Sequence, residues 1–215
     1  MSLNVGDVIE IMEALAPSHL AEDWDNVGLQ VGRIDWPVQS IWVALDPTPA
    51  VMDAVCGAGG DLLITHHPLI FKPLQKIDFS TPEGKVVRRA VLDQTAVFSA
   101  HTNLDSAKEG LNDLLARKIG LNQISVLKPP VDLSKSDRDP MGEADVVEGM
   151  GRIGILEKKT TLARLATSIK KALELVSIQV AGRPDLPVGK VAVCTGSGGG
   201  LLSVSYTHLR AHETT

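Results

Sequence analysis

The sequence predicts an α/β protein with two α/β lobes, parallel-rich sheets and a metal site at the carboxyl ends of the strands. Short apolar runs, typical of buried strands, alternate with segments that carry helix-start signals. The first three runs lead directly into residues that can bind a metal. A second set of alternating runs follows a polar, proline-containing stretch at residues 128–142, which indicates a second lobe.

The first lobe is expected to be a βαβαβ unit. The strands are predicted at residues 41–45, 62–64 and 95–100, and the helices at residues 48–58 and 82–94. Thr81 is a possible N-cap of the second helix, with Pro82 at its first helical position. Because crossovers of this kind are right-handed, the three strands should be parallel and should end at one edge of one sheet.

Two adjacent histidines, His66 and His67, stand where the second apolar run stops. Pro68 keeps His67 out of the helical region, so the pair stays extended and its side chains diverge. This divergence suits two metal ions better than one. A strand-end histidine can equally be an ordinary hydrogen-bonded loop residue, so the pair alone leaves both interpretations open.

The other two strand ends favour the metal interpretation. His101 and Asp105 follow the third strand, and Asp46 follows the first, although an Asx turn before Pro47 explains Asp46 equally well. Histidine with carboxylate suits zinc, iron or manganese. The potential ligands expected at this edge are Asp46, His66, His67, His101 and Asp105.

The rest of the chain is expected to form the second lobe. A strand at residues 152–156, a helix with its apolar face from Leu162 to Leu173, and strands at residues 176–180 and 188–194 are predicted. We expect an N-terminal α/β metal-binding lobe at residues 1–128, an incomplete second α/β lobe at residues 129–202, and a tail at residues 203–215 that is foreign to the fold.

Four motifs in register make the chain resemble a known family. They are AEDWDNVGLQVG at residues 21–32, ALDPT at residues 44–48, ITHHPLIF at residues 64–71 and SAHTNLD at residues 99–105. Together they resemble the GTP cyclohydrolase 1 type 2-like family, also called NGG-interacting-factor-three-like or dinuclear metal centre hexameric, from Val5 to about Leu202. Within the first motif, Trp24 and Asp25 can line a pocket, but such residues at a turn usually pack and cap.

The resemblance implies a dinuclear centre that holds two divalent metal ions, zinc, iron or manganese. It implies that His66 and His67 each bind one ion, that Asp105 binds one of them, and that His101 is a near neighbour. His101 is also the best candidate for a catalytic acid or base. Family members add a later His and Glu, which this chain is expected to lack. His212 and Glu213 are residue types that could serve as these ligands, but we interpret them as part of the foreign tail and not as metal ligands.

Such a centre is expected to catalyse hydrolysis of a nucleotide or phosphoester-like small-molecule substrate, and the family name implies GTP cyclohydrolase activity. The alternative is a non-catalytic metal-binding or metal-handling assembly; a homohexamer is implied for the full-length form. A net charge of −5 and a pI of about 5.7 predict no general binding of nucleic acid. The sequence contains no apolar run of membrane-spanning length and no secretion signal, so a cytoplasmic protein without membrane association is expected.

Overall fold

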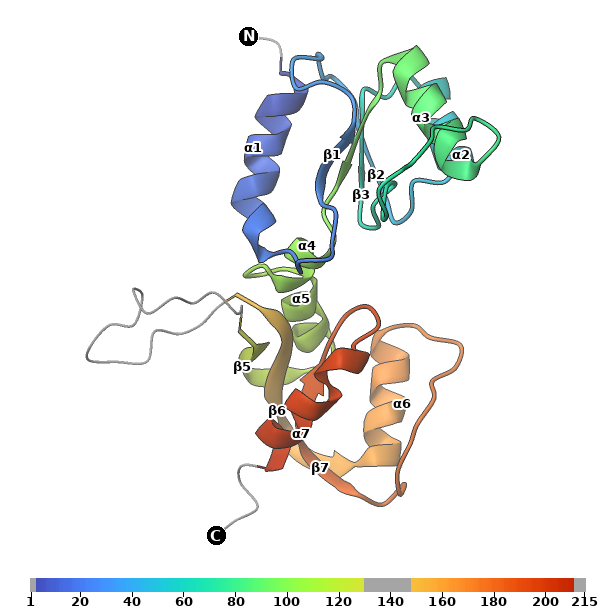
Figure 1. Cartoon of the computed structure of the whole chain (residues 1–215). Coiled ribbons are helices and arrows are strands. Elements are labelled where there is room, and N and C mark those ends of the chain that lie inside the picture. Colours follow the sequence, from blue (N-terminus) through green and yellow to red (C-terminus); the bar gives the residue numbers. More distant parts are fainter. Residues whose placement is uncertain (1–2, 130–147, 211–215) are drawn as a thin grey trace, which may run out of the picture. The chain divides into compact units, whose positions relative to one another are not determined.

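The computed structural model describes residues 3–129 and 148–210, and the chain forms two compact units, Met1–Leu104 and Asp105–Thr215 (Figure 1). Each unit contains a sheet and helices, which confirms the α/β fold class. The expected division at residue 128 into lobes, with a foreign tail, stays a prediction. Within the two described stretches, the helices are all too short or too polar to span a membrane.

Among its described residues, the first unit contains a four-stranded sheet and four helical segments that lie entirely within it. Its elements are α1 (Val5–Leu15), η1 (Ser18–Leu20), β1 (Gly28–Val31), β2 (Ile41–Ala44), α2 (Pro49–Gly57), β3 (Leu62–Thr65), α3 (Pro82–Asp93) and β4 (Ala96–Ser99). Helix α4 (Thr102–Ser106) follows β4 and runs across the division between the units. The predicted strands and helices of the βαβαβ unit are therefore confirmed to within a few residues.

The sheet order is β1-β4-β3-β2. Strands β2, β3 and β4 are parallel, as predicted, while β1 pairs with β4 in the antiparallel direction. The register places Ala44 beside Thr65 and Thr65 beside Ser99, so the three parallel strands end at the same level. The residues that follow these strand ends are thereby brought to one edge of the sheet.

Helices cover both faces of this sheet, with α1 on one side and α2 and α3 on the other (Figure 1). Successive side chains of a strand point to opposite faces, and β3 shows the consequence. Leu62 packs with Val5 of α1, whereas Leu63 packs with Met52 of α2 and Val86 of α3. Two apolar clusters therefore hold the sheet between its helical layers.

Threonine side chains fix where the two crossover helices begin. The Thr48 hydroxyl accepts a hydrogen bond from the Val51 amide at the start of α2, and the Thr81 hydroxyl accepts one from the Gly84 amide at the start of α3. Both helices have proline in their first turn, where the missing N–H has no intrahelical partner to lose. The predicted N-cap at Thr81 is confirmed.

Strand β2 lies at the edge of the sheet and is less buried than its apolar sequence suggested. Ile41 is 44% exposed, Trp42 is 38% exposed and Val43 is 78% exposed. An apolar run alone does not distinguish a central strand from an edge strand, because both contain the same β-forming residues.

The second unit is built around a three-stranded sheet. After the boundary in α4, its elements are α5 (Leu111–Lys118), β5 (Leu121–Lys128), β6 (Met150–Thr161), α6 (Leu162–Ala172), β7 (Pro187–Val193), η2 (Gly199–Leu201) and α7 (Leu202–Arg210). The sheet order is β5-β6-β7, and both pairings are antiparallel. The expectation of a parallel-rich second sheet is therefore wrong.

The path of the chain after α6 explains the antiparallel pairing. The Leu162 amide donates to the Leu186 carbonyl, and the Ala163 amide donates to the Pro184 carbonyl. These hydrogen bonds bring the chain back to the place where β6 ended, so β7 must run in the opposite direction. The strand predicted at residues 176–180 is also wrong: this returning segment has no strand, and Val176 is 93% exposed.

A buried ion pair stabilises the second unit. Arg152 of β6 is 1% exposed, and its Nε and Nη2 atoms bind the two carboxylate oxygens of Asp113 at 2.8 and 2.7 Å. The same guanidinium donates to the carbonyls of Gly149, Gly151 and Ala107. A buried charge is tolerated only when it is paired and hydrogen-bonded, and Arg152 meets both conditions.

Candidate metal centre

Backbone hydrogen bonds continue the sheet for one or two residues beyond β3 and place the histidines. The His66 amide donates to the Ala44 carbonyl at 3.3 Å, the His67 amide donates to the Leu45 carbonyl at 3.0 Å, and the Ala100 amide donates to the Thr65 carbonyl at 2.9 Å. His66 and His67 are therefore fixed at the end of β3. His101 emerges two residues after β4, at the same edge.

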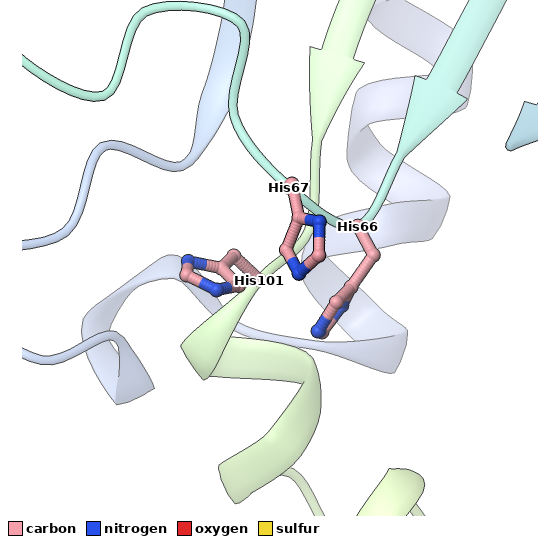
Figure 2. Close-up of side chains that lie close together, drawn as sticks. All are labelled: His66, His67 and His101. Atoms are coloured by element: carbon pink, nitrogen blue, oxygen red, sulfur yellow. The ribbon is translucent and has the colours of Figure 1, made fainter. Parts of the chain in front are cut away.

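Three imidazole rings meet at this edge (Figure 2). The ring centroids are 5.2 Å apart for His66 and His67, 5.0 Å for His66 and His101, and 5.5 Å for His67 and His101. One nitrogen of each ring lies within 4.8 Å of one nitrogen of each other ring. Within the part of the chain that the structure describes, this is a group that can hold a metal ion.

Each of the three rings has its Nδ1 atom at hydrogen-bond distance from an oxygen. His66 Nδ1 lies 3.0 Å from the Ala100 carbonyl oxygen, His67 Nδ1 lies 2.7 Å from Asp46 Oδ1, and His101 Nδ1 lies 2.9 Å from Asp25 Oδ1. A carbonyl or carboxylate oxygen accepts a hydrogen bond, so these contacts place the proton of each neutral ring on Nδ1. The lone pair of each neutral ring is then on Nε2, which is the usual state of a metal-binding histidine.

Asp25 is the more deeply buried of the two carboxylate acceptors. Its carboxylate has no exposed surface, whereas the His101 side chain is 16% exposed. Besides His101, it accepts hydrogen bonds from the Thr102 amide at 3.0 Å and the Thr102 hydroxyl at 2.5 Å. Burial raises the pKa of Asp25, but the hydrogen bonds from His101, Thr102 and Asn26 outweigh it and hold the pKa below its ordinary value.

The partner of His67 is in a different environment. The His67 side chain is 46% exposed and that of Asp46 is 50% exposed. The two aspartate–histidine pairs in the cluster therefore have similar bond lengths but very different contact with water. Asp46 was predicted as either a ligand or a turn residue, and the structure places it as the hydrogen-bond partner of His67.

Small polar side chains hold the backbone around the histidines. The Thr65 hydroxyl donates to the His67 carbonyl at 2.8 Å, and the Ser99 hydroxyl donates to the His66 carbonyl at 3.0 Å. The His101 amide donates to Asn103 Oδ1 at 2.9 Å. Because side-chain hydrogen bonds reach the backbone of each histidine, the positions of all three rings are restrained.

Asp105 is described with the second unit, near the end of α4. Its side chain is buried and accepts a hydrogen bond from the Thr195 hydroxyl at 2.6 Å. Asn112 donates to the Asp105 carbonyl at 2.9 Å and accepts from the Thr195 amide at 2.7 Å. The role of Asp105 as a metal ligand stays a prediction. His212 and Glu213 lie outside the described residues.

The donor set fits a metal ion. Imidazole nitrogens are common ligands of metals such as zinc and iron, and three imidazoles lie together here. The sequence identified the three histidines but not the pairing of Asp25 with His101 or of Thr195 with Asp105. Asp25 lies inside the first family motif, which was the available signal; nothing in the sequence pointed to Thr195.

The fold and the site define an α/β protein of two units, the first with a histidine cluster that can hold a metal ion at the ends of parallel strands. The family model Duf34/NIF3 (NGG1p interacting factor 3) matches residues 3–208. The chain therefore belongs to the Duf34/NIF3 family, and the resemblance found in the sequence is confirmed.

Individual relatives agree with this assignment. A Clostridium acetobutylicum protein named GTP cyclohydrolase 1 type 2 homolog is 38% identical over 198 residues, which are 92% of this chain and 70% of that protein. A Streptomyces coelicolor protein of the same name is 36% identical over 209 residues, covering 96% of this chain and 68% of that protein. The crystal structure of a Bacillus cereus protein related to NIF3 matches with a TM-score of 0.84 at 26% identity, covering 97% of this chain and 80% of that one.

Proposed function

We propose that this protein is a metal-dependent hydrolase with a dinuclear divalent-metal centre. The observation that carries the proposal is the close grouping of the three imidazoles, each with its Nδ1 at hydrogen-bond distance from an oxygen. His66, His67 and Asp105 would hold the two ions, which we expect to be zinc, iron or manganese. Divalent ions of this kind act as Lewis acids and lower the pKa of water toward neutrality.

In this proposal His101 is the general acid and base. Its Nδ1–H donates to the buried carboxylate of Asp25, so its Nε2 can take a proton from water or substrate and return it to a leaving group. A carboxylate next to Nδ1 stabilises the protonated ring that such a transfer creates. His66 differs in this respect, because its partner is the uncharged Ala100 carbonyl. Asp25 acts through His101 and is therefore a positioning residue.

The proposed substrate is a nucleotide or another phosphoester-like small molecule. Two relatives are named GTP cyclohydrolase 1 type 2 homolog, which supports GTP as the first compound to test. Ring opening of GTP by water and cleavage of a phosphoester are both hydrolyses, and each needs a proton to be moved at the site of attack. The same acid–base residue would serve either reaction.

A second candidate function is non-catalytic metal binding or metal handling by an oligomeric assembly. It is supported by the position of His101, which offers a nitrogen in the same group as His66 and His67. If His101 is a third ligand, its Nε2 is occupied and cannot carry a proton. The two functions therefore differ in what His101 does, and that difference can be measured.

The test compares three alanine variants of the 215-residue chain after dialysis against zinc or manganese. His66→Ala should lose bound metal, whereas His101→Ala should keep it and lower turnover by ~100-fold or more. His19→Ala is the control, because His19 is exposed in η1 and outside the cluster. Substrates are GTP, the other nucleoside triphosphates and simple phosphoesters. Metal loss in His101→Ala, with no turnover by the parent protein, would support the metal-binding assembly instead.

We also propose that the full-length protein assembles as a homohexamer, on the basis of the family resemblance alone. Light scattering at several protein concentrations measures the mass directly. A constant mass of one chain would contradict this proposal without affecting the assignment of His101.

A further inference from the structure

We propose that Trp24 and Phe71 form an aromatic wall that binds the planar heteroaromatic ring of the substrate beside His101. This proposal rests on the hydrolase function proposed above and names the part of the substrate that the site recognises. The two rings have centroids 5.8 Å apart and an interplanar angle of 62°. They lie in the first unit, as His101 does.

The wall presents aromatic surface to water. Trp24 is 58% exposed and Phe71 is 48% exposed. These exposed fractions leave surface on both residues that a third flat ring can contact. Exposed aromatic groups that sit together commonly mark a binding surface, because they remain costly to hydrate until a ligand covers them.

The wall lies next to the proposed acid–base residue. The Trp24 ring centroid is 6.1 Å from that of His101, with an edge-to-face angle of 75°. Trp24 directly precedes Asp25, which binds the His101 ring, and Phe71 follows His67 by four residues. A flat ring packed on the wall would therefore lie within reach of the group that moves the proton.

Hydrogen bonds fix the two segments that carry the wall. Asn26 Nδ2 donates to the Ile70 carbonyl at 2.5 Å, and the Ile70 amide donates to Gln30 Oε1 at 3.2 Å. Gln30 Nε2 in turn donates to the Asn26 carbonyl at 3.0 Å. These contacts clamp the residue before Phe71 to the segment after Trp24. The wall is preorganised, so ligand binding does not have to order it.

The chemistry favours a heteroaromatic ring over an aliphatic or peptide ligand. Aromatic side chains bind planar rings by stacking, which tolerates different bases because every base has a π-face. As defined here, the wall comprises the rings of Trp24 and Phe71, and a pair of rings matches one flat ring better than a protein interface of many residues. Because the wall lies beside His101, the proposed acid–base residue, we expect its ligand to be a small substrate and not a macromolecule.

Binding of flat-ring probes by the metal-loaded 215-residue chain tests the proposal. The probes are guanosine monophosphate, uridine monophosphate and nicotinamide mononucleotide, with ribose 5-phosphate as the ringless control, measured by calorimetry. At least one flat-ring probe should bind more tightly than ribose 5-phosphate. Trp24→Leu and Phe71→Leu should each weaken that binding by about 10-fold or more and leave ribose 5-phosphate unchanged. Trp24→Phe should restore most of the affinity.

Trp42→Leu is the matched control, because Trp42 is 38% exposed in β2 and is not part of the wall. It should bind the probes like the parent chain. The amount of bound metal, measured in every variant, should not change. Loss of probe binding at the wall can therefore be distinguished from loss of metal. Equal binding by Trp24→Leu and the parent, or no preference for any ring over ribose 5-phosphate, would overturn the proposal. Binding of a flat-ring probe without turnover of any substrate would support the proposed wall and contradict only the proposed hydrolase function.

Discussion

Replacing Asp25 with alanine should destabilise the first unit much more than the same change at Asp46. Both carboxylates bind a histidine Nδ1, at 2.9 and 2.7 Å, but only Asp25 is completely buried. Asp25→Ala also removes the acceptor of two hydrogen bonds from Thr102, which is 4% exposed. Bonds to a charged group contribute about 1.5–3 kcal/mol each, and neighbouring losses are not additive, so we expect a cost of about 3–5 kcal/mol.

Asp46→Ala should cost less than about 1 kcal/mol, because a half-exposed ion pair gains little over water. Urea unfolding followed by tryptophan fluorescence measures both costs, since all three tryptophans, Trp24, Trp36 and Trp42, belong to the first unit. A chelator should be present so that metal binding does not add to stability. Equal costs for the two variants within about 0.5 kcal/mol would refute the view that burial decides the strength of these pairs.

Two further predictions concern the second unit. Arg152→Ala should destabilise it by about 3–5 kcal/mol, because the buried Asp113 carboxylate would lose its partner, and faster hydrogen exchange of the β6 amides would detect this; unchanged exchange would contradict it. Val176→Asp should change the free energy of unfolding by no more than about 0.5 kcal/mol, because Val176 is 93% exposed; a large loss in urea unfolding would instead indicate that residues 176–180 pack as the strand first predicted.

Local sequence signals predicted the first unit well and the second unit only in part. Thr81 and Pro82 define the start of α3 by their own chemistry, and apolar runs define β3 and β4, so these elements need no distant information. The direction of β7 depends instead on contacts such as the hydrogen bond between the Leu162 amide and the Leu186 carbonyl, two residues far apart in the sequence. Alternating residues at 176–180 have the period of a strand, but no neighbouring strand pairs with them.

The candidate site, too, could be predicted from the sequence only in part. His66, His67 and His101 could be predicted because each follows a parallel strand, and the register of such strands brings their ends together. Asp25 could not be paired with His101 in this way, since it precedes an antiparallel strand and lies 76 residues away in the sequence. Side-chain pairing across that separation depends on tertiary packing, which no short sequence pattern encodes.

At the turn that contains Asp25, the same residues stabilise the fold and contact the candidate site. Asp25 accepts from the Thr102 amide at the first residue of α4, which is a structural capping role, and the same carboxylate binds His101. Trp24 on one side contacts His101 and Phe71, while Asn26 on the other side binds the Ile70 carbonyl. Three consecutive residues therefore join the β3 and β4 ends. A single change here would alter both the stability of the unit and the orientation of its histidines.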